Sequence, residues 1–173
     1  MVRNFVVAGV APNGYHGQLR DALRKAEEVS GKRLKDWHGS SQSMKVRYLD
    51  ECFKLEALRG RLFFRTHADI RPATFMYCTA QTLMAAADIL GGDRCQVKAA
   101  HEGFTQGKRK RLEQMLTPRG RFEVRSGAFE AKPEIRLADA LCGFLAAVYD
   151  LNPHKRGRGG PFEHLPLDWL VRV

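Results

Sequence analysis

The chain has 173 residues, a length suited to one domain that buries a core without disulfides or a structural metal. Lysine and arginine number 29 against 19 acidic residues, and the resulting formal charge of +10 favours polyanionic partners, with nucleic acid first and an anionic membrane surface second. The four cysteines form no CxxC pair, which argues against a zinc site. The sequence shows neither a charged-then-apolar leader, as secretion would need, nor an apolar run of about 18 residues, as a membrane span would need, and it therefore predicts a cytoplasmic protein.

Apolar spacing and turn residues predict an alternation of strands and helices. Short β-branched or aromatic runs bounded by Gly, Pro or Asn predict strands, and apolar residues three and four apart predict amphipathic helices. In chain order we expect a strand over 4–10, a helix over 16–29, a helix that Ser41 or Ser43 caps and that runs to about Leu58, a strand over 61–68, a long helix over 73–90, a strand over 96–100, a basic helix over 105–116, a strand over 121–126 and a helix over 134–150. The tail over 151–173 joins basic turn residues to apolar ones and is expected to pack on the same domain.

One segment near the end of the chain resembles a known family. FEAKPEIRLADALCGFLA, residues 129–146, is similar to the end of the domain of unknown function 3800 family, an RNase H-like group in which a turn residue precedes a Leu-Gln-Leu-Ala-Asp-like helix start. Upstream, NFVVAGV at 4–10 resembles that family's second strand, WHGS at 37–40 resembles its inter-helix loop, and Tyr77 lies where its long helix often carries a tyrosine. The order of these matches covers most of 1–150.

The resemblance implies an α/β fold of the RNase H-like kind, with a mixed sheet flanked by helices over 1–150. Members of the family usually open with a strand that carries Asp-Glu-Ser-Gly, whose first acid is the leading metal ligand. This chain has no such segment, so its first strand is missing or replaced. The second strand-borne acid of the family falls near the end of QVKAAHEG, where this chain has His101 and Glu102 instead of an aspartate. Only Asp139 matches residue for residue.

RNase H-like nucleases use two divalent metals, and Mg²⁺ or Mn²⁺ is therefore the implied cofactor of a catalytic version. The resemblance names Asp139 and Glu102 as metal ligands and adds His101 as a third catalytic residue. A second interpretation of Asp139 needs no metal, because an acid in the first turns of a helix is stabilised by the helix dipole. Glu102 could likewise be an exposed acid in a turn, and His101 an ordinary surface histidine.

Two basic segments, at 108–111 and 155–158, are candidates for binding phosphates, and the second could instead be only a linker. KRKR at 108–111 occupies a helix start, where acids are usually preferred, so an external anion could compensate; a solvated charge run is the alternative. Trp37 and Phe104 could stack on bases or pack in the core. The predicted nucleic-acid-binding residues are Lys108, Arg109, Lys110, Arg111, Lys155, Arg156 and Arg158.

These observations predict a nucleic-acid-binding RNase H-like protein, a degenerate nuclease that works as a subunit of a nucleoprotein complex with DNA or RNA. Two alternatives stay open. One is an active metal-dependent nuclease completed by a partner chain or by a homo-oligomer, since exposed sheet edges invite pairing. The other is a non-catalytic scaffold for protein interactions, whose charge serves solubility.

Overall fold

The computed structural model describes residues 3–11, 16–33, 37–90, 95–98, 105–117, 122–125, 132–149 and 162–173. The chain is mixed α/β, as the sequence predicts. Its helices and strands are β1 (Arg3–Val10), α1 (His16–Ser30), α2 (Gln42–Cys52), β2 (Leu62–Ile70), α3 (Phe75–Leu90), β3 (Cys95–Lys98), α4 (Gln106–Leu116), β4 (Phe122–Arg125), α5 (Pro133–Val148) and β5 (Leu170–Arg172).

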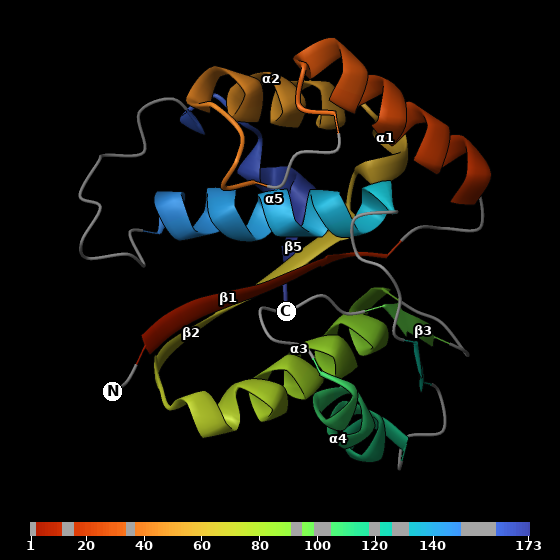
Figure 1. Ribbon diagram of the computed structural model, residues 1–173, viewed down its shortest axis with the longest axis vertical. Helices are drawn as coiled ribbons and strands as arrows, with labels where there is room; N and C mark the ends of the chain where they lie inside the picture. Colours follow the sequence, from red (N-terminus) through yellow and green to blue (C-terminus); the bar gives the residue numbers. More distant parts are fainter. Residues whose placement is uncertain are drawn as a thin grey trace.

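A small mixed sheet lies between helical layers (Figure 1). Its strand order is β1-β2-β5, with β1 antiparallel to β2 and β2 parallel to β5. Helix α5 lies along one face, with α1 and α2 beyond it, and α3 with α4 lies on the other side. A separate parallel pair, β3 and β4, lies beside α4.

Alternate residues of β1 and β2 supply the two faces of this sheet. Val6 and Ala8 pack against the larger core, which contains the apolar side of α5. Phe5 points the other way and packs on Phe75 of α3, with ring centroids 4.6 Å apart. Both faces are therefore covered, which explains why these strands are almost continuously apolar or half-buried rather than sharply alternating.

The larger core joins α1, α2, α5 and the sheet around side chains such as Leu23, Leu49, Leu141 and Phe144, each with no exposed surface. A smaller cluster joins α3 to α4 through Met76, Ala80, Leu112 and Leu116. Among the described residues no helix is both long and apolar enough to cross a membrane.

The structure corrects the predicted helix that ran to Leu58. Helix α2 ends at Cys52, and a 3-10 turn over Glu56–Leu58 follows. Leu58 is fully buried and Leu55 packs on the same core. The apolar spacing correctly indicated that these leucines are in the core. A 3-10 turn can bury them as well as an α-helix can, so the spacing alone does not distinguish a turn from a helix.

Strand β5 was also missed. Residues 170–172 were predicted only as part of an apolar tail, whereas they pair in parallel with Leu62, Phe63 and Phe64. Three residues are too few for a period-2 pattern to be recognised, and the partner strand lies over 100 positions away in the chain. The four predicted strands were expected in one sheet, but β3 and β4 form a sheet of their own.

Candidate nucleic-acid interface and the surroundings of Asp139

Helix α4 carries the basic run 108–111. Thr105 caps the helix, since its hydroxyl accepts a hydrogen bond from the Lys108 backbone N–H at 3.4 Å. Leu112 and Leu116 are fully buried against α3 and fix which side of α4 faces the protein. The first turn contains no acidic residue.

The four consecutive cations do not share one face, because successive helix residues are rotated by about 100°. Lys110 and Arg111 are exposed, whereas Lys108 and Arg109 are partly buried on the flanks of the leucine side. The sequence predicted a single phosphate-binding group, but helix geometry divides the run. Lys110 and Arg111 are the members best placed to meet a partner in solvent.

Asp139 holds a loop in place. Its side chain is exposed on α5, and its Oδ2 accepts a hydrogen bond from the Trp37 backbone N–H at 3.1 Å. One turn further along α5 is Gly143, where an added Cβ would lie 2.0 Å from the Trp37 indole Nε1. The small residue beside Asp139 therefore makes room for Trp37 rather than for a ligand of Asp139.

Trp37 itself belongs to the core. It is 6% exposed and packs near Phe162, with ring centroids 6.1 Å apart, while Lys45 lies over its ring at 5.1 Å. A side chain in this position is not available to stack on a base, so core packing, one of the two predicted roles of Trp37, is the one observed.

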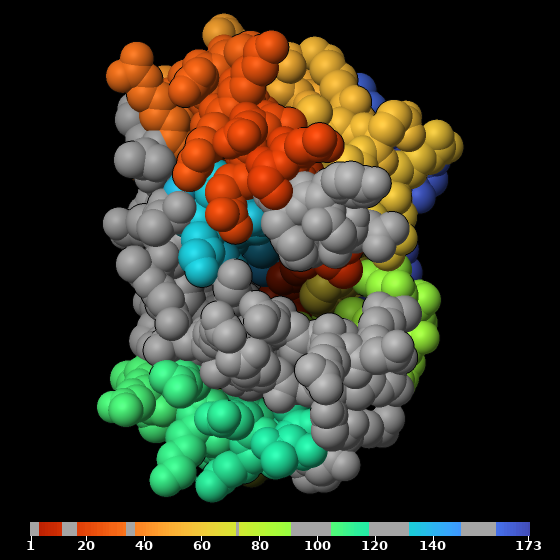
Figure 2. Space-filling model, turned by 90° about the vertical axis from the view of Figure 1, so that its right-hand side faces the viewer, coloured from red at the N-terminus to blue at the C-terminus, as the bar shows by residue number. Residues whose placement is uncertain are grey.

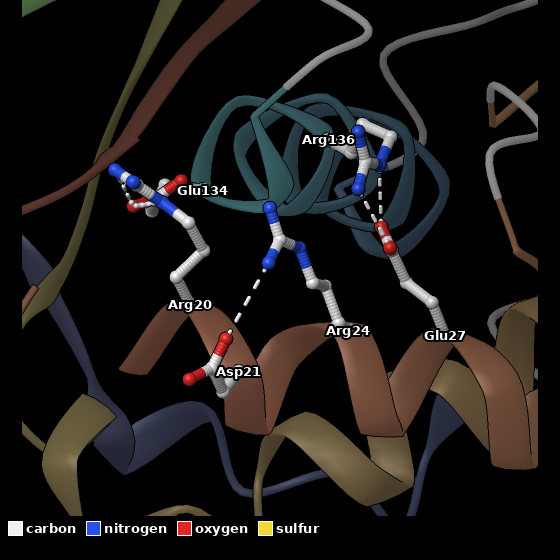
Figure 3. Close-up of polar contacts among 6 residues, drawn as sticks. All are labelled: Arg20, Asp21, Arg24, Glu27, Glu134 and Arg136. Carbon is white, nitrogen blue, oxygen red and sulfur yellow. Dashed lines mark hydrogen bonds and ion pairs between the residues drawn. The ribbon is translucent and has the colours of Figure 1, made fainter. Parts of the chain in front are cut away.

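Charged residues that the sequence interpretation passed over join α1 to α5 (Figure 3). Glu27 accepts two hydrogen bonds from Arg136, at 2.5 and 2.7 Å, and both side chains are buried. Nearer the start of each helix, Arg20 binds Glu134 at 3.1 Å. The two pairs have opposite polarity, since α1 contributes Arg20 and Glu27 while α5 contributes Glu134 and Arg136.

Lys32 is a third buried charge at this junction. The helix α1 ends at Ser30, and Gly31 adopts a left-handed φ of 75°, which turns the chain back toward the core. The Lys32 side chain is fully buried and its ammonium lies 4.9 Å from the centre of the Tyr48 ring. Burial lowers the pKa of Lys32, while the Glu27 carboxylate opposes that shift.

Arg136 is the residue from which the sequence could have indicated the buried charges between α1 and α5. It stands between Ile135 and Leu137 in a helix rich in apolar residues, and a charged residue that such a helix buries needs a partner. The sequence does not say which acid supplies that partner, because Glu27 lies 109 positions away.

His67 faces α3 rather than solvent. Its ring stacks on Phe5 at 4.9 Å, and its Nε2 lies 3.1 Å from the Thr82 hydroxyl. That hydroxyl donates its one hydrogen to the Cys78 carbonyl at 2.9 Å, so it accepts from His67, which carries its proton on Nε2. Burial, and then the nearby Arg65 charge, lower the pKa of His67.

The remaining predicted site residues lie outside the described part of the chain: His101, Glu102, Lys155, Arg156 and Arg158, together with Phe104. Among the residues that are described, no three His, Cys, Asp or Glu side chains come together as a metal site would require. Cys52, Cys78 and Cys142 are free thiols, and burial raises the pKa of Cys52 and of Cys142 to about 12.

Comparison with protein-family models, with curated proteins and with solved structures gave no match.

Proposed function

We propose that this protein binds nucleic acid and that α4 makes the contact. The observation that carries the proposal is the placement of Lys110 and Arg111 on the solvent side of a helix whose first turn has no acid, in a chain with a formal charge of +10. Phosphate groups are the anions that such a surface attracts most strongly, because each neutralised phosphate also releases counterions.

We further propose that the fold is a divergent RNase H-like domain that no longer depends on catalysis. A mixed sheet with helices on both sides supports the first part. The proposed loss of catalysis depends on which side chains could bind a metal, since Mg²⁺ and Mn²⁺ are held by hard oxygen ligands such as carboxylates. Asp139 is the only predicted ligand within the described residues, and its carboxylate is already engaged by Trp37. This part of the chain does not fit a two-metal centre.

A second candidate is an active nuclease that a second chain completes. Strand β1 favours it, because β2 pairs with one edge of β1 and no strand among the described residues pairs with the other. An open edge can accept a strand from another molecule, and such a strand could bring the missing acid.

Labelled single- and double-stranded DNA and RNA, incubated with the protein and Mg²⁺ or Mn²⁺, test both candidates. We expect salt-sensitive binding without cleavage, and the same binding for Asp139→Asn. A Lys110→Gln/Arg111→Gln variant should bind more weakly, and the dependence of log K on log salt should become shallower, since each lost phosphate contact removes about 0.9 from the slope.

The matched control is Arg24→Gln/Lys25→Gln, which removes the same charge from two exposed neighbours on α1. If the two double variants lose equal affinity, net charge rather than α4 explains binding. Cleavage that disappears in Asp139→Asn would instead establish the second candidate. A protein that binds no nucleic acid at low salt would be better described as an interaction scaffold.

A further inference from the structure

The solvent side of α4 is a narrow stripe of residues that contains no acid. Gly107, Lys110, Arg111 and Gln114 follow one another at three- and four-residue spacing, and all four are exposed. Leu112 and Leu116 occupy the opposite side and are fully buried. Glu113, the one acid of the helix, is partly buried and lies off the stripe.

The helix is also placed where a large partner can reach it. Figure 2 shows α4, coloured green to turquoise, at the lower end of the molecule. Its 11 residues span roughly 16 Å at 1.5 Å per residue. An α-helix of this kind fits the major groove of B-form DNA, which is about 12 Å wide, whereas the major groove of an RNA duplex is too deep and narrow for side chains to read.

The side chains on the stripe match the chemistry of that groove. Arginine donates two hydrogen bonds to the O6 and N7 of guanine, and glutamine pairs with the N6 and N7 of adenine. Arg111 and Gln114 are three residues apart, so their Cα atoms are separated by about 4.5 Å along the axis, between one and two steps of about 3.4 Å from one base pair to the next. Lys110 suits a phosphate, and Gly107 has no side chain to hold the helix away from the groove.

We infer that the solvent face of α4 enters the major groove of double-stranded B-form DNA, with Arg111 and Gln114 toward base edges and Lys110 toward the backbone. This inference rests on the proposed function and adds the kind of nucleic acid and the role of each side chain. Charge complementarity selects the partner, and the absence of an acid on the stripe removes the main obstacle to close approach.

Fluorescence anisotropy with three labelled probes tests the inference: a 20-base-pair DNA duplex pool with a randomised centre, the equivalent RNA duplex pool and single-stranded DNA. We expect the DNA duplex to bind at least about tenfold more tightly than the other two. Repeated selection from the DNA pool should then enrich sites that place a guanine beside an adenine.

Three single variants separate the roles. Arg111→Lys and Gln114→Ala should each reduce the preference for the enriched site over the random pool by about tenfold while the salt slope changes little, as expected for contacts to bases. Lys110→Gln should lower the slope by about one without changing that preference. Arg24→Gln, on α1, should change neither. All replaced side chains are exposed, and circular dichroism verifies that each variant is folded.

Other outcomes would overturn the inference, and they show whether the groove contact alone or nucleic-acid binding as a whole is wrong. Equal affinity for the three probes, or an Arg111→Lys variant and a Gln114→Ala variant that both keep the sequence preference, leaves the proposed function intact but removes the groove contact. Failure to bind any of the probes at low salt overturns the inference and the proposed function together. Binding to vesicles of anionic lipid in place of nucleic acid does the same.

Discussion

Replacing Glu27 with glutamine is the perturbation whose cost the structure predicts most directly. The carboxylate of Glu27 is 3% exposed and neutralises Arg136, which is 7% exposed, while the buried ammonium of Lys32 also interacts with both charges. Glutamine has nearly the same shape but no charge. Glu27→Gln therefore removes the negative charge that lies against these two buried cations.

The expected loss is large. Removing one partner of a buried ion pair costs about 3–5 kcal/mol, because the remaining charge stays desolvated and uncompensated. With a urea dependence of about 2 kcal/mol per molar, the midpoint of unfolding should fall by roughly 1.5–2.5 M. Urea unfolding followed by far-UV circular dichroism measures this shift directly.

Asp21→Asn is the matched control, because it makes the same chemical change on the same helix. The Asp21 carboxylate is 77% exposed and meets Arg24 at 3.4 Å, and exposed pairs contribute only about 0–1 kcal/mol (Figure 3). In addition, Glu27→Gln/Lys32→Met should recover part of the lost stability, since it removes one of the two buried cations. A Glu27→Gln midpoint no lower than that of Asp21→Asn would mean that Glu27 does not stabilise the fold by neutralising buried charge.

Three further predictions test individual contacts. Asp139→Ala should lose about 1–2 kcal/mol of stability because the Trp37 N–H loses its acceptor, and Asp139→Asn should lose less, both by urea unfolding. Gly143→Ala should destabilise by about 1–3 kcal/mol and shift tryptophan fluorescence to the red, because its Cβ would overlap the Trp37 indole. Gly17→Ala, which meets nothing within 4 Å on α1, should be neutral or slightly stabilising. Finally, because the pKa of His67 is lowered in the folded protein, the unfolded chain binds more protons, so stability should be full above the ordinary pKa of 6.5 and should fall as the pH drops below it. His67→Gln should flatten that dependence.

Each of these expectations has a result that contradicts it. Equal stability of Asp139→Ala and wild type would mean that the bond to Trp37 contributes nothing. Gly143→Ala and Gly17→Ala variants with the same midpoint would show that Trp37 is not held against α5. A His67→Gln variant whose stability falls as steeply between pH 7 and pH 5 as that of the wild type would place the responsible proton elsewhere.

Much of the local structure follows from sequence alone. Apolar spacing predicted α1, α3, α4 and α5 to within a few residues, and the β-branched run of β1 predicted that strand. Pro133 occupies the first turn of α5, where its missing N–H has no consequence. These features depend on contacts between residues that are close together in the chain, so the order of residues is enough to predict them. The excess of positive charge is likewise a property of composition.

Tertiary structure decided what the charged and aromatic residues do. That Arg136 meets Glu27, that Trp37 rests on Gly143 and that β5 pairs with β2 all depend on residues roughly 100 positions apart, which no local pattern encodes. The division of the run 108–111 into exposed and flanking cations depends on which side of α4 packs against α3. Asp139, which the resemblance named as a metal ligand, accepts a hydrogen bond from the Trp37 backbone in the folded chain, a contact between residues 102 positions apart that no local pattern encodes.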